Sequence, residues 1–191
     1  MQVIDRKNPL FHFLLASGLL VLSFAVCEVL HLLDPMHLDV HGRPEVHLVF
    51  VPYGMMVLLA WIYGWMVVPL VLPVMLVAAA YLVGPDHMTP TVAALTVARV
   101  VFVMLALELV RMVFFDPRQG TGRAALVALF GAGVISAVGF AAVRVAFSPC
   151  CDVMSPWERV MAFAASVGAD MAGLVIVMAG AMFLFRALRH D

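Results

Sequence analysis

The sequence predicts an all-α integral membrane protein: a single polytopic bundle of about six transmembrane helices over residues 1–191, with no separate soluble domain. Hydrophobic residues make up 65% of the chain and charged residues only 12%, a composition outside the range of soluble domains. From Leu48 to Val83 no side chain carries a formal charge. A straight helix of that length would measure about 54 Å, against a bilayer core of about 30 Å. This segment is therefore expected to fold back as two spans.

Helix start signals divide the rest of the chain. A capping residue precedes proline at Asn8-Pro9, Thr89-Pro90 and Ser155-Pro156, and Ser155 forms a capping-box pattern with Glu158. The break inside the long apolar segment is expected at Tyr63-Gly64-Trp65, where glycine permits the turn, and Pro69 and Pro73 are expected to kink the span that follows. The six predicted spans are Pro9–Leu33, His47–Gly64, Trp65–Val83, Pro90–Phe115, Arg123–Phe147 and Pro156–Leu188.

The distribution of arginine and lysine predicts the orientation. With the N-terminus inside, the cytoplasmic segments hold most of the basic residues, and the opposite side holds few. The cytoplasmic set is Arg6, Lys7, Arg111, Arg118, Arg123, Arg186 and Arg189, and the outer set is Arg43, Arg144 and Arg159. Both termini are therefore expected in the cytoplasm of a bacterium, with the protein in its inner membrane and the first span acting as an uncleaved anchor.

Several function classes are disfavoured. The net charge is −1 with a single lysine, so no basic surface for nucleic acid is expected. No motif for nucleotide binding, serine hydrolysis or zinc proteolysis occurs. The predicted cytoplasmic loops are short, so we expect no attached signalling or ATPase domain. We therefore expect two partners. One is the lipid bilayer, and the other is a membrane protein that passes on a signal or supplies energy.

The connection after the first span is rich in potential metal ligands. Four histidines stand there, with three carboxylates between them: His31, His37, His41 and His47, with Asp34, Asp39 and Glu45. Imidazole and carboxylate suit zinc, nickel, cobalt or manganese, so a divalent transition metal is a candidate cofactor. Further candidates on the same side are Asp86, His87, Cys150, Cys151 and Asp152. The alternatives are a solvated polar loop, because the spacing matches no established metal signature, and a pH sensor.

The cysteines leave two possibilities open. Cys27 lies near the same predicted surface as Cys150 and Cys151, so a disulfide to either is conceivable in an oxidising compartment. The other interpretation is that Cys27 is a buried thiol that acts as a small apolar residue.

Charged residues inside predicted spans are costly, so they indicate a site or an internal partner. Asp170 lies near the middle of the last span, on a face of small residues formed by Ala162, Ser166, Ala169 and Gly173. We expect Arg99 as its partner, with Glu28 and Arg144 in the same outer third of the membrane. These four residues predict either a buried pocket that binds a small polar or charged solute, or a set of ion pairs that fixes helix register.

Glu108 and Arg111 are spaced for a local helical ion pair. A second interpretation makes this inner face a docking surface for a partner, because the small residues Ala128, Ala132 and Ser136 on the adjacent span permit close helix contact.

The segment from His47 to Pro73 carries a family resemblance. With Pro52-Tyr-Gly54, Tyr63-Gly64-Trp65 and Pro69, it resembles the proline-glycine helix and glycine-bounded hairpin of bacterial membrane-associated sensor domains. That family is in turn similar to the substrate-binding subunits of energy-coupling-factor transporters. The resemblance implies an outward-facing ligand pocket in a six-helix bundle. The chain departs from both, because no cytoplasmic signalling domain is seen and Ala16, Leu20 and Phe24 interrupt a small-residue stripe.

Two main functions follow as expectations. The first is a membrane binding component that captures or senses a small solute or metal ion at the outer face and works with a partner. The alternative is a structural or assembly subunit of a larger membrane complex. An intramembrane enzyme that uses Asp170 or the histidines for acid–base or metal-assisted chemistry is a third and weaker hypothesis.

Overall fold

The computed structural model describes residues 8–32, 49–113, 123–147 and 155–187, and its regular elements are all helical. Six α-helices and two short 3₁₀ turns, η1 and η2, follow one another in the described parts of the chain. They are α1 (Pro9–Leu32), α2 (Val51–Tyr63), η1 (Gly64–Met66), α3 (Val67–Val83), η2 (Pro85–His87), α4 (Pro90–Val113), α5 (Arg123–Phe147) and α6 (Pro156–Ala187). Each α-helix falls within one predicted span, so the predicted all-α class is confirmed.

The three predicted helix starts are capped as expected. The Asn8 side chain accepts a hydrogen bond from the Phe11 amide at 3.3 Å, and the Thr89 hydroxyl accepts one from Val92 at 3.3 Å. At α6 the capping box is complete. Ser155 N donates to the Glu158 carboxylate at 2.8 Å, and Glu158 N donates to the Ser155 hydroxyl at 3.4 Å.

The long apolar segment breaks at Gly64, as predicted. Gly64 adopts φ 60° and ψ −143°, a conformation open mainly to glycine, and it ends α2. The helix α3 continues through Pro73. With 13 residues, α2 is about 20 Å long, which is less than the hydrocarbon thickness of about 30 Å.

Five helical segments of the described chain are long and apolar enough to cross a membrane. They are Pro9–Leu30, Val51–Val83, Pro90–Val113, Ala124–Phe147 and Pro156–Phe183, so α2 and α3 count here as one segment. These apolar helices suit a lipid bilayer.

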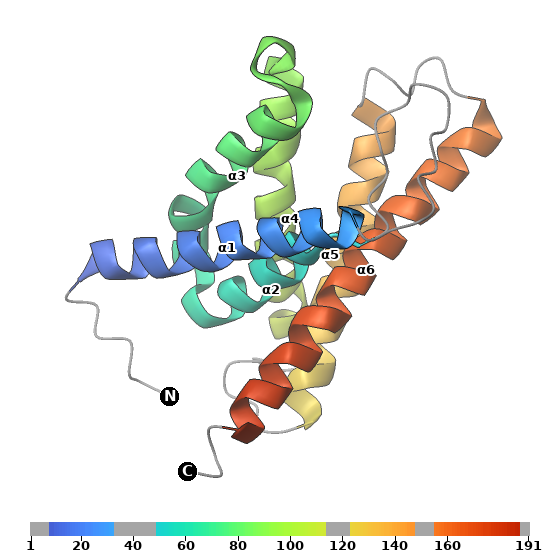
Figure 1. Cartoon of the computed structure of the whole chain (residues 1–191). Coiled ribbons are helices and arrows are strands. Elements are labelled where there is room, and N and C mark those ends of the chain that lie inside the picture. Colours follow the sequence, from blue (N-terminus) through green and yellow to red (C-terminus); the bar gives the residue numbers. More distant parts are fainter. Residues whose placement is uncertain (1–7, 33–48, 114–122, 148–154, 188–191) are drawn as a thin grey trace.

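The helix α2 forms the centre of the molecule. Figure 1 shows α1 running across the other helices, with α3 beside α4 on one side and α5 beside α6 on the other. Most of the side chains of α2 are buried, including Tyr53, Met56, Leu59 and Ala60, and the largest contact of α2 is with α6. A short helix that is apolar on every face is typical of a core element.

Contact between α2 and α6 is close enough to bring backbones together. The Phe50 amide donates a hydrogen bond to the Ala169 carbonyl at 2.9 Å. A Cβ at Gly54 would lie 2.8 Å from Leu174 Cα, and a Cβ at Gly173 would overlap the Phe50 carbonyl. The face of small residues predicted around Asp170 therefore receives α2, as its composition indicated.

Candidate functional site

An ion pair between Arg99 and Asp170 lies inside the helix bundle. Asp170 is on the buried face of α6, and Arg99 is on α4, in the half that begins at Pro90. The Arg99 guanidinium donates from Nη2 to Asp170 Oδ1. The side chain of Asp170 is 1% exposed, whereas that of Arg99 is 14% exposed. The predicted partnership of these two residues is present, and the residual exposure is on the arginine side of the pair.

Aromatic rings from the start of α2 and from α5 enclose the guanidinium. Arg99 Cζ lies 4.2 Å from the centroid of the Phe50 ring, 4.8 Å from that of Phe140 and 5.8 Å from that of Tyr53. Phe50 precedes α2, Tyr53 is in its first turn, and Phe140 is on α5. The negative face of an aromatic ring attracts a cation at such distances. The charge of Arg99 therefore has two supports, one carboxylate and a group of three rings.

Two polar atoms of the pair are buried without a hydrogen-bond partner in the described structure. They are Arg99 Nε and Asp170 Oδ2. The first is a donor and the second an acceptor. A buried polar group without a partner costs about 1–3 kcal/mol, so this centre is the polar point of the core that is least satisfied by the protein itself.

The Tyr53 ring is held in place by α5. Its hydroxyl donates to the Gly133 carbonyl and shares a hydrogen bond with the Ser136 hydroxyl. Both Tyr53 and Ser136 are buried. This anchor ties the first turn of α2 to α5 and fixes the ring beside Arg99.

The other two predicted ligand-binding residues lie around the pair in different ways. Arg144 is on α5, its guanidinium is 3.5 Å from the Ser166 hydroxyl, and its charge acts on Asp170. Glu28 is partly buried in α1 and, within the described residues, makes no hydrogen bond or ion pair with Arg99 or Arg144. The four predicted residues therefore form a close pair with Arg144 near it, and Glu28 is not a direct member.

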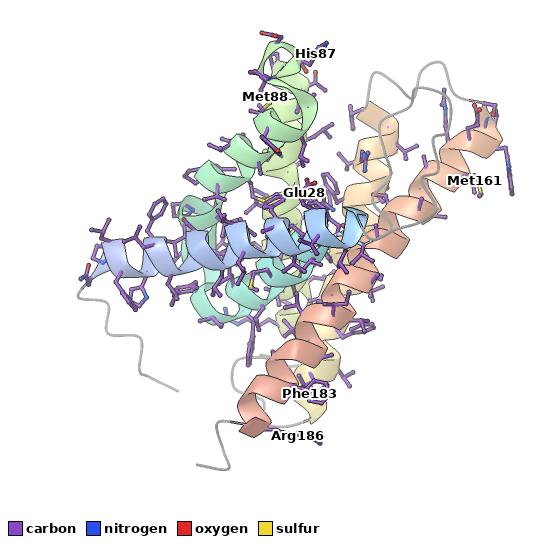
Figure 2. All side chains as sticks on the ribbon, viewed as in Figure 1. Glu28, His87, Met88, Met161, Phe183 and Arg186 are labelled. Atoms are coloured by element: carbon purple, nitrogen blue, oxygen red, sulfur yellow. The ribbon has the colours of Figure 1, made fainter. Side chains whose placement is uncertain are left out.

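Most of the predicted metal ligands lie outside the described residues. His37, His41 and His47 belong to residues 33–48, together with Asp34, Asp39 and Glu45, and Cys150, Cys151 and Asp152 belong to residues 148–154. His31 is in the last turn of α1, and its side chain is not described. Asp86 and His87 are exposed in η2, and Figure 2 shows His87 and Met88 at the tip that joins α3 to α4, away from Glu28. Within the described chain no three potential ligands come together.

Cys27 is a free, buried thiol. Its sulfur donates a hydrogen bond to the Val49 carbonyl at 3.1 Å. The interpretation as a small buried residue is therefore confirmed, and the proposed disulfide from Cys27 is not formed.

The predicted local pair near the end of α4 is confirmed. Arg111 Nη1 lies 3.4 Å from Glu108 Oε2 at the surface. The small residues named for a docking surface on α5, Ala128, Ala132 and Ser136, are buried by helices of this same chain, and a partner surface at the inner face stays a prediction. Their small size serves the internal packing of α5 rather than a partner.

The aromatic residues around Arg99 were not predicted as site residues. A usable signal existed, because Phe140 and Arg144 are four residues apart and share one face of α5, as Phe50 and Tyr53 share the start of α2. An intramembrane arginine also has a general affinity for aromatic faces. Comparison with known protein families, curated proteins and solved structures finds no match to this chain.

Proposed function

We propose that this protein is a membrane binding component that captures a small polar solute at the outer face and works with a partner membrane protein. The observation that carries the proposal is the Arg99–Asp170 centre, which is buried among α2, α4, α5 and α6 and retains one unpartnered donor and one unpartnered acceptor. Ionisable residues inside membrane helices are costly and are mostly retained where they bind or relay something. A solute that carries both a hydrogen-bond acceptor and a hydrogen-bond donor would satisfy Arg99 Nε and Asp170 Oδ2.

Six spans with both termini in the cytoplasm are part of the proposal. Figure 2 has His87 and Met161 towards one end of the molecule and Arg186 at the other. The last turns of α4 and α6 carry Arg111 and Arg186, which agrees with the excess of basic residues expected on the cytoplasmic side of a bacterial inner membrane. In this orientation Arg99 is nine residues from the outer end of α4, about 14 Å along the helix.

The resemblance to membrane-associated sensor domains and to energy-coupling-factor binding subunits supports the same class of function. Metal capture at His31, His37, His41 and His47 is the variant of the proposal in which a divalent ion is the ligand.

A structural role in a larger membrane complex is the second candidate. It is favoured by the position of the pair, which links α4 to α6 beside the backbone contact between Phe50 and Ala169. A pair with only this role would hold helices in register and bind nothing.

Native mass spectrometry of the detergent-purified protein separates the two functions whatever the chemical identity of the solute. A bound small molecule is expected on the wild type and is expected to be lost in Arg99→Gln and Asp170→Asn. Glu108→Gln and Arg111→Gln are matched controls, because they change the same kinds of charged residue at a surface pair. Loss in the controls as well, or a folded wild type that carries no solute after purification in any of several mild detergents, favours the structural role.

The double variant Arg99→Met/Asp170→Leu removes both charges and keeps the volume apolar. If the single variants fail to fold, the double variant replaces them in the test. It is more apt to fold because it leaves neither charge buried alone. A folded double variant that still carries the solute contradicts the proposal.

A further inference from the structure

The second carboxylate oxygen of Asp170 is enclosed in the packed helix bundle. Asp170 is 1% exposed, and its Oδ2 atom is buried without a partner among the described residues. The residue is also near the middle of α6, 14 residues after Pro156. A proton occupies no additional volume, so it can bind Oδ2 within the packed structure.

Few groups favour the ionised form of Asp170. In the described parts of the chain, the charged or titratable side chains that act on it are Arg99 of α4, Arg144 of α5 and Tyr53 of α2. Of these, Arg99 donates its direct hydrogen bond. The Tyr53 hydroxyl is engaged with Gly133 and Ser136 and does not donate to the carboxylate. The carboxylate therefore accepts one hydrogen bond, from Arg99, and its second oxygen has a lone pair that can take a proton.

Arg99 keeps favourable contacts when Asp170 becomes neutral. Its guanidinium lies over the rings of Phe50 and Phe140, and these contacts do not depend on the charge of the carboxyl group. Cation–π attraction strengthens when the site is desolvated. Loss of the ion pair therefore does not leave the buried arginine without support.

From these contacts we infer that Asp170 is a proton-binding site that makes and breaks the link between α4 and α6. A hydronium ion in the water phase gives up a proton, which is relayed to Oδ2, and leaves as water; the carboxylate becomes a neutral acid. The attraction between Arg99 and Asp170 is then lost, while Arg99 stays between the aromatic rings. This inference goes beyond the proposed function, and it holds whether or not a solute binds.

Infrared difference spectroscopy of the protein in lipid vesicles tests the inference with the proton as the probe. As the pH falls from about 9 to about 4, the wild type is expected to gain the carbonyl stretching band of a buried carboxylic acid. Glu108→Gln is the matched control and is expected to keep the band, whereas Asp170→Asn is expected to lack it. Labelling the wild type with carboxyl-¹³C aspartate is expected to move the band to lower frequency, which assigns it to aspartate without any substitution.

The Arg99→Gln variant adds a directional test. Removing the guanidinium removes the charge that favours the carboxylate, so the titration midpoint of the band is expected to move to higher pH by about one to three units. A wild-type spectrum without such a band, a band that persists in Asp170→Asn, or a midpoint unchanged by Arg99→Gln overturns the inference. A native mass spectrum without solute leaves it intact, so the two proposals fail separately.

Discussion

The carbonyl of Phe50 lies against the Cα of Gly173, in the space that a side chain at position 173 would occupy. One turn earlier on α6, the Ala169 carbonyl accepts the hydrogen bond from the Phe50 amide. The backbone at the start of α2 is therefore held against the backbone of α6. Asp170 is next to Ala169 in sequence, and the Phe50 ring lies over Arg99, so this backbone contact lies directly beside the ion pair.

Gly173→Ala is expected to destabilise the protein strongly. The added methyl group would meet backbone atoms, which cannot move aside as a flexible side chain can, so the cost should reach or exceed the roughly 1–3 kcal/mol typical of overpacking. Thermal unfolding in detergent measures this effect. The control is Gly180→Ala on the same helix, where nothing lies within 4 Å of the added methyl group and a small gain is expected. Equal melting temperatures for the two variants would contradict the close α2–α6 contact.

Breaking the ion pair from either side is expected to cost more than removing it altogether. Asp170→Leu leaves the arginine without its carboxylate, and Arg99→Met leaves a carboxylate buried alone, at a cost of about 3–5 kcal/mol for a buried pair. The double variant is expected to be more stable than either single one. Chemical denaturation of the three proteins and the wild type forms a double-mutant cycle. Additive effects in this cycle would show that the two residues do not interact.

At a pH where the lone carboxyl group of Arg99→Met stays ionised, the milder of the two single variants is expected to be Asp170→Leu. In that protein Arg99 retains its aromatic neighbours, whereas the carboxylate left in Arg99→Met has no comparable support. The same denaturation curves measure the difference, and the reverse order would argue against a role for the rings.

Tyr53→Phe is expected to lower stability by about 1–3 kcal/mol, because the Gly133 carbonyl and the Ser136 hydroxyl lose a buried partner. Unfolding temperature is again the measurement. Tyr81→Phe is the matched control, since Tyr81 is exposed, and it is expected to have little effect. Double substitution of Tyr53→Phe with Ser136→Ala should cost less than the sum of the single changes.

A divalent metal, if it binds the histidines after α1, is expected to raise the melting temperature in a saturable manner by mass action. The measurement compares chelator with zinc, nickel, cobalt, manganese and copper. His37→Ala and His41→Ala are expected to abolish the shift, whereas His87→Ala at the α3–α4 tip is expected to preserve it. A shift that none of the substitutions changes, or no shift with any of these metals, rejects this histidine site.

The helix boundaries were predictable because local chemistry determines them. Proline after a capping residue, the Gly64 break and the apolar lengths act within a few residues of each boundary, and α5 begins and ends at the predicted residues Arg123 and Phe147. Pairing of Arg99 with Asp170 was also predictable, since a buried charge requires an opposite charge.

The surroundings of the pair were harder to predict from sequence. Which helix covers the small-residue face of α6 depends on tertiary packing, and periodicity cannot choose among neighbouring helices. The same ambiguity applies to the small residues of α5: Ala132 and Ser136 permit close approach by any helix, and in the structure they are buried within this chain. The helical spacing of Phe140 and Arg144, and the nearness of Phe50 to Tyr53, could have marked these rings as candidates, but aromatic residues are abundant in apolar spans and the spacing does not say that they meet Arg99.

The order of the helices along the chain has a consequence for biosynthesis. Arg99 is made with α4, but its carboxylate partner is on α6, the last of these helices to leave the ribosome. Phe50 and Tyr53 are made before Arg99, and Phe140 follows with α5, so all three rings are present before α6 is inserted. The aromatic rings can therefore receive the charged side chain first, and arrival of Asp170 completes the site and locks α6 against α2.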